Sequence, residues 1–245
     1  VPESYNSGQH YVELAYLTPA EQSLLAQVDM YNSNPPHTGP AGIPNFNGGG
    51  GGGGTLVAAN GITLTAGHSL TGSGEILTKD ILHQGTITAT GSGIIIRGNL
   101  SGAGNFPGPS EILITGTYEP GNSPAIVTFG GDLVFGSNAR LVMEIEGPDP
   151  GTGHDQLIVA GQLTVAGTLE GVLAEDYDPV INQLFNLLDF NSFSGQFSQV
   201  LFTGSSLATG LDWDNSQLYS DGIVSVTDPL PPVTSALADM ELAED

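Results

Sequence analysis

The sequence contains no cysteine and only three basic residues. Without cysteine, the chain can form neither disulfide bonds nor thiol-based active sites. The bases Lys79, Arg97 and Arg140 stand against 26 acidic residues, which leaves a formal net charge of −23. Nucleic acids and anionic membranes are bound largely through Lys and Arg, so we expect neither as a partner.

Long hydrophobic runs are also missing. No apolar run is as long as a membrane-spanning helix requires, so we expect no membrane insertion. No signal peptide begins at Val1, and an exported protein would therefore be present here in its processed form. Scarce lysine with abundant Gly, Asn, Ser and Thr suits a bacterial surface protein. We expect an extracellular or cell-surface location after signal-peptide removal.

Aromatic residues are few, at 7% of the chain, whereas turn-forming residues are frequent. The 36 glycines and 16 prolines make up more than a fifth of the sequence, nearly twice their usual share. Val, Ile, Leu and Thr, which favour strands, are common as well. The composition therefore predicts an all-β protein with many corners.

Residues 1–47 differ from the rest and form a predicted N-terminal arm. Thr18 and Glu21 match a capping box, and Pro19 occupies the first helical position, which predicts a short helix at about 18–31. A proline-rich, extended stretch follows it. The apolar stripe of the helix, at helical spacing, consists of Leu17, Leu24, Leu25, Val28 and Tyr31.

Seven consecutive glycines, Gly48 to Gly54, follow the arm. One interpretation is a flexible linker, because such a run has maximal backbone freedom and no side chain to pack. The other is a closely packed backbone, or a hinge that lets the arm reach a neighbouring subunit. We assign the candidate assembly contacts to Leu17, Leu24, Leu25, Val28, Gly48 and Gly54.

Short β runs recur over residues 55–227, and an acidic tail at 228–245 follows them. Runs such as "TITAT" and "GIIIRG" alternate in the period-2 pattern of half-buried strands, and no helical stretch separates them. Two architectures remain open: a β-sandwich of antiparallel hairpins, or a parallel β-solenoid. Very short runs at close intervals favour the solenoid, in which each run forms one side of a coil.

Several spaced elements resemble the end region of autotransporter-type β-helix passengers. They also resemble a related module of exported bacterial surface proteins that often carry a C-terminal Pro-Glu-Pro sorting signal. The likeness covers roughly residues 115–227. Its elements are Pro120–Pro124, Gly131–Asp132, Leu141–Gly147, Asp155–Val159 and Gly161–Leu169.

The resemblance implies a right-handed parallel β-helix on an exported protein, in which Trp213, Leu218 and Tyr219 close the end of the core. The sequence shows neither a C-terminal barrel nor a Pro-Glu-Pro signal, so the route of export is not carried over from the family. The fold we predict is this β-helix preceded by the helix-containing arm, with the β-sandwich as the alternative.

No set of residues matches a known catalytic arrangement. The histidines lack metal-binding spacing, the chain has no Gly-x-Ser-x-Gly elbow, and the glycine run lacks the lysine of a phosphate loop. We therefore expect no enzyme activity and no cofactor. The histidines are His10, His37, His68, His83 and His154.

Acidic clusters are the remaining candidates for a site. Asp212, Asp214 and Asp221 offer carboxylate oxygens of the kind that calcium binds, although the EF-hand pattern is absent. They are weak metal candidates, and solvated turns are the other interpretation. A carbohydrate-active enzyme built on these acids is a further hypothesis, but three bases are few for a lyase that acts on acidic polysaccharides.

These observations predict a structural protein that self-assembles into an extracellular filament, sheath or surface layer. Its partners would be other copies of itself, and extracellular polysaccharide is a further candidate. The alternative is a monomeric surface adhesin or glycan-binding passenger domain.

Overall fold

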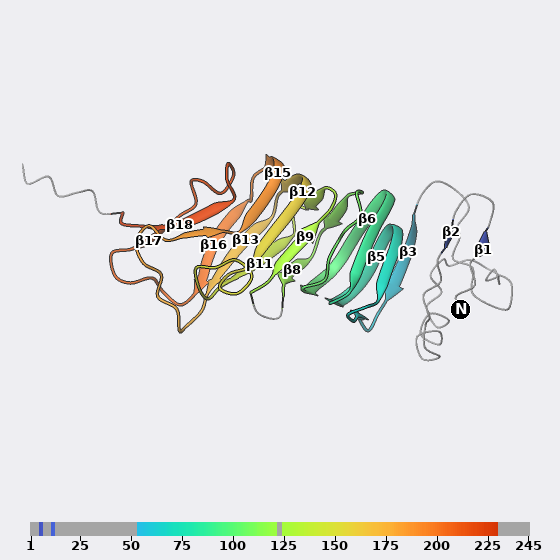
Figure 1. The fold of residues 1–245 in the computed structure, drawn as a ribbon, viewed down its shortest axis with the longest axis horizontal. Coiled ribbons are helices and arrows are strands. Elements are labelled where there is room, and N and C mark those ends of the chain that lie inside the picture. Colours follow the sequence, from blue (N-terminus) through green and yellow to red (C-terminus); the bar gives the residue numbers. More distant parts are fainter. Residues whose placement is uncertain (1–4, 7–10, 13–52, 122–123, 230–245) are drawn as a thin grey trace, which may run out of the picture.

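The computed structural model describes residues 5–6, 11–12, 53–121 and 124–229. Within these ranges the chain forms strands and turns and contains no helix, as the composition predicts. The strands lie side by side along the long axis of an elongated molecule (Figure 1). The helix predicted at about 18–31 lies outside the described residues, and so does the acidic tail of residues 228–245 except for its first two residues.

One thirteen-stranded sheet makes up most of the molecule, and all its strand pairs are parallel. Its strands are β3 (Gly54–Ala58), β4 (Ile62–Leu64), β5 (Ser69–His83), β6 (Thr86–Gly102), β7 (Ile112–Ile114), β8 (Thr117–Pro120), β9 (Ile126–Phe129), β10 (Leu133–Phe135), β11 (Arg140–Ile145), β12 (Gln156–Val165), β13 (Thr168–Leu173), β15 (Leu188–Gly195) and β16 (Gln199–Gly204).

Two small antiparallel sheets complete the described structure. The first pairs β1 with β2, and the second has the order β14-β18-β17. The strands within residues 212–227, which the sequence assigned to the solenoid, belong to this second sheet instead of the parallel one. The bounds are β1 (Tyr5–Asn6), β2 (Tyr11–Val12), β14 (Leu184–Asn186), β17 (Asp212–Asp214) and β18 (Ile223–Thr227).

The chain returns to the same side of the sheet after each turn. Ile76 lies opposite Ile96, and Ile96 lies opposite Ile114. A later turn, which runs from Leu169 to Val200, is longer than either of these. A tight hairpin cannot join parallel neighbours, so the chain must wind around the molecule between them. This pairing is compatible with a β-solenoid and excludes a sandwich of antiparallel hairpins for this sheet.

The inward side chains of successive turns stack as three ladders. All the members named below are almost fully buried because each is covered by the turns before and after it. The first ladder contains Ile76, Ile96, Ile114 and Phe135; the second contains Ile81, Leu100, Tyr118, Leu141 and Leu169; the third contains Ile87, Phe106, Phe129 and Val159.

Glycines at the corners let one long strand cover several sides. β6 bends at Gly98, whose φ is +143°, a value that side-chain-bearing residues rarely adopt. A Cβ at this position would also lie 2.2 Å from the carbonyl oxygen of Thr78 on the preceding turn. The glycine-rich corners noted in the sequence therefore serve both conformation and close stacking of the backbone.

Aromatic residues cover the C-terminal end of the parallel sheet. Trp213 of β17 stacks on Phe202 of β16 with ring centres 4.3 Å apart, and Tyr219 contacts Phe193 of β15 at 5.6 Å between ring centres. Leu218 is fully buried. The prediction that Trp213, Leu218 and Tyr219 close the end of the core is thus confirmed.

Candidate functional site: the open edge of the first turn

The first turn of the parallel sheet has an open edge. β3 and β4 both pair with β5 on one side. Within residues 53–121 and 124–229, no strand pairs with their other side. Unpaired strand edges present N–H and C=O groups that readily accept another strand. This end of the molecule therefore has the geometry to bind an extended segment.

The side chains of the first turn are less buried than those of the next turn. Leu56 and Ile62 are only partly buried. Their neighbours in the adjacent turn, Ile76 and Ile81, are 4% and 2% exposed. The difference arises because no described strand of the sheet stacks outside the first turn. Burying this apolar surface would stabilise a contact in proportion to its area, at roughly 25 cal/mol per Å².

The end of the glycine run packs against this same turn. Gly54 is the first residue of β3 and pairs with Gly74 of β5, so it lies in the sheet and not in a linker. A Cβ on Gly53 would lie 2.2 Å from the backbone of Ser73. For these two glycines the closely packed interpretation is confirmed, and the rest of the run lies outside the described residues.

The sequence anticipated only part of this surface. Gly54 lies on the open edge, whereas Leu17, Leu24, Leu25, Val28 and Gly48 lie outside the described residues, and their role stays a prediction. Leu56, Ile62 and Leu64 were missed. A signal for them was present, because they are apolar positions of the first two β runs and have no earlier run to stack on.

The acidic candidates for a metal site lie on β17 and in the turn before β18. Asp212 accepts a hydrogen bond from the Trp213 N–H, and Asp214 accepts one from the Ser216 N–H, each at 2.8 Å. The bond from Ser216 lowers the pKa of Asp214. Asp221 accepts the Ser220 hydroxyl at 2.8 Å. No group of three metal-binding side chains occurs in the described part of the chain.

His83, at the end of β5, is a buried titratable group inside the core. Its ring meets Phe106 edge-on with centres 4.6 Å apart. Neither ring nitrogen has a hydrogen-bond partner among the residues described. Burial lowers the pKa of His83 to about 4. The imidazole is therefore neutral at neutral pH and packs as an aromatic core residue.

Asp155 is a buried carboxylate that connects separate segments. It accepts hydrogen bonds from the N–H groups of Ala125 and Glu144, each at 2.8 Å. Burial raises its pKa to about 7, although the two hydrogen bonds favour the ionised form and oppose this rise. The position of these partners, just before β9 and within β11, indicates that Asp155 fixes the path of the chain between turns.

Comparisons with protein-family models, with curated proteins and with solved structures found no match. The resemblance to autotransporter-type passengers and sorted surface proteins therefore stays a prediction from the sequence. Within the part of the chain that the structure describes, no helix is long and apolar enough to cross a membrane.

Proposed function

We propose that this protein is an exported structural protein whose copies join end to end into an extracellular filament, sheath or surface layer. The observation that carries the proposal is the first turn, where an open parallel edge coincides with partly buried core residues such as Leu56 and Ile62. A surface of this kind suits a contact made by main-chain hydrogen bonds together with apolar burial.

In the proposed contact, the first turn and the N-terminal arm of one copy meet the β15–β16 end of the next copy, where β15 and β16 also pair with the described strands of the sheet on one side only. The arm precedes Gly54, the first residue of the open strand β3, and supplies the apolar stripe predicted from the sequence. Aromatic side chains cover part of the core at that end, with Trp213 stacked on Phe202. Because two different ends of the molecule meet, the contact is head-to-tail, and it continues into a filament when the rotation between copies does not close a ring.

The proposal includes a right-handed parallel β-helix as the fold of the subunit. Each turn connects one strand to a parallel neighbour in the same sheet, as between Ile76 and Ile96. Such connections are right-handed in the great majority of proteins, because right-twisted strands pack back onto their sheet in that sense. The stacked turns give a rod whose ends are the natural places for contact.

The test is negative-stain electron microscopy and light scattering of the full chain at physiological salt. We expect filaments or sheets for the wild type. The double variant Leu24→Asp, Leu25→Asp places two charges on the predicted apolar stripe and should reduce assembly at least tenfold. The matched control Gln22→Asp, Ser23→Asp adds the same charge beside the stripe and should assemble like the wild type.

Separate single particles for the wild type would contradict the proposal. They would be expected if the arm covered the edge of its own chain. Equal loss of assembly in both double variants would also count against a contact through the stripe, because added charge alone would then explain it.

A further inference from the structure

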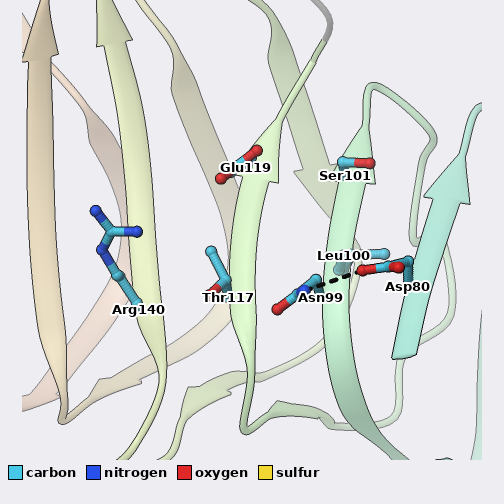
Figure 2. Close-up of a pocket in the computed structure, with 7 residues that line it drawn as sticks. All are labelled: Asp80, Asn99, Leu100, Ser101, Thr117, Glu119 and Arg140. Atoms are coloured by element: carbon cyan, nitrogen blue, oxygen red, sulfur yellow. Dashed lines mark hydrogen bonds between the residues drawn. The ribbon is translucent and has the colours of Figure 1, made fainter. Parts of the chain in front are cut away.

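A polar hollow lies on the outer side of the second ladder and begins at β5, the strand next to the open first turn. It has a volume of about 310 Å³ and is formed by four strands, β5, β6, β8 and β11, that belong to successive turns (Figure 2). Its lining consists of Asp80, Asn99, Leu100, Ser101, Thr117, Glu119 and Arg140.

The alternation of the strands places these polar groups on one outer surface. Leu100 and Tyr118 point inward and are 1% and 0% exposed, so the residues on either side of them point outward. The Asn99 amide donates a hydrogen bond to Asp80 at 2.9 Å across the β5–β6 pair. Ser101 lies opposite Glu119 in the next pair. Donors and acceptors therefore follow one another from strand to strand.

A fixed ion pair forms one end of the hollow. Arg140 pairs with Glu170 on β13, and Glu170 also accepts the Thr203 hydroxyl of β16 at 2.7 Å. Glu170 is only 6% exposed, so this guanidinium is held by a buried partner. Bonds that hold polar groups in place before binding reduce the entropy cost of binding a ligand.

The charge and spacing of the lining indicate the class of ligand. Asp80 is paired with Lys79 at 3.6 Å, and Arg140 is paired with Glu170. Glu119 is therefore the lining charge without an ion-pair partner among the described residues, and it disfavours an anion. Asp80 and Glu119 lie two strands apart, roughly 10 Å at the usual strand spacing. That separation is too large for one metal ion, whose oxygen ligands lie at about 2.3–2.6 Å. Carboxylate, amide, hydroxyl and guanidinium groups together match a ligand rich in hydroxyl groups, each of which both donates and accepts.

We propose that this hollow binds an uncharged polysaccharide whose chain runs across the strands. Four neighbouring strands span roughly 14 Å, which is longer than a single sugar ring. Neighbouring strands are about 4.8 Å apart, close to the length of one pyranose unit in an extended chain, so successive sugars meet successive strands. The hollow faces outward from the side of the strands, whereas the open edge of the first turn faces along the long axis of the molecule (Figure 1).

The test is titration calorimetry of the full chain with neutral hexasaccharides: cellohexaose, xylohexaose, mannohexaose and laminarihexaose. Hexagalacturonate serves as the anionic control. We expect binding of at least one neutral hexasaccharide and no binding of hexagalacturonate. Thr117→Val removes one lining hydroxyl while keeping the shape of the side chain, and Asn99→Ala removes the amide. Each should raise the Kd at least tenfold.

Thr128→Val is the matched control, because Thr128 points outward beside the third ladder, outside the hollow. It should bind like the wild type, and thermal unfolding should show all three variants to be folded. No binding of any neutral hexasaccharide would overturn the proposal. Binding of hexagalacturonate alone would overturn the ligand class, and equal weakening by Thr128→Val would overturn the location.

Discussion

At the scale of single residues, the core enclosed by the parallel strands contains ionisable side chains, which are rare in hydrophobic cores. His83 is buried against Phe106 without a hydrogen bond from its ring to another described residue. Asp155 is buried as well, but it accepts two backbone hydrogen bonds. Their pKa values shift in opposite directions, because burial disfavours the charged form of each group.

We predict that His83 contributes stability that is lost in acid. Its pKa is about 4 in the folded chain and about 6.5 in the unfolded chain, so the unfolded chain binds more protons between these values. The contribution of His83 to stability is therefore complete above about pH 6.5 and is lost as the pH drops towards 4, by up to about 3 kcal/mol. Asp155 acts in the opposite sense, because its pKa is raised from 3.8 to about 7 and its contribution grows as the pH falls over the same range. The difference in urea unfolding midpoint between the wild type and a His83 variant, measured at several pH values, isolates the His83 part.

The stability difference between the wild type and His83→Leu should shift towards the variant as the pH drops from about 6.5 to about 4, whereas the difference for His68→Leu, at an exposed position, should stay constant. A constant difference for His83→Leu would contradict the acid-sensitive contribution of His83.

At the scale of elements, close stacking of the turns depends on corners without side chains. Gly98 on β6 lies against the carbonyl oxygen of Thr78 on β5. No Cβ can be placed at Gly98 without moving the backbone. The same strands carry the inward ladder residues, so a shift at the corner also disturbs the packing of neighbours such as Ile96 and Leu100. Corner glycines and core residues therefore constrain each other.

We predict that Gly98→Ala lowers the free energy of unfolding by about 1–3 kcal/mol, because the new Cβ adds both backbone strain and a clash with the Thr78 carbonyl oxygen. Gly72→Ala on β5 is the control, since a Cβ at Gly72 meets no atom within 4 Å and its φ is not in the left-handed region. It should change stability by less than about 0.5 kcal/mol. Thermal unfolding measures both, and equal midpoints would contradict the role of Gly98.

At the scale of the whole molecule, the charge of −23 opposes contact between copies. Dissolved salt shortens the reach of this repulsion from about 30 Å at 0.01 M to about 8 Å at 0.15 M. Apolar burial and main-chain pairing at the open first turn act only at contact. Assembly should therefore be controlled by ionic strength.

We predict that the size of the assemblies rises with added sodium chloride. Light scattering of the full chain between about 0.01 and about 0.3 M measures this, because screening changes strongly over that range. Magnesium chloride at equal ionic strength should increase the size of the assemblies as much as sodium chloride does, because screening depends on ionic strength. Assemblies that dissociate as salt is added would instead indicate that attraction between opposite charges holds the copies together.

Strand alternation and turn chemistry are local properties, so the class of structure follows from the sequence alone. Runs such as "GIIIRG" and the absence of helical spacing after Thr55 indicated an all-β chain with many corners. The covering role of Trp213 was implied by the resemblance to β-helix passenger modules. These inferences needed no knowledge of which strands are neighbours.

Strand pairing, and every site that depends on it, appears only in the folded chain. The number of residues between paired strand positions differs from one turn to the next. Because the spacing is not constant, the sequence does not show which residues lie opposite one another in neighbouring strands. Asp80 and Arg140 are far apart in the sequence and line one hollow only because successive turns stack in one alignment. The open first turn is likewise visible only when each strand is known to be paired on one side or on both.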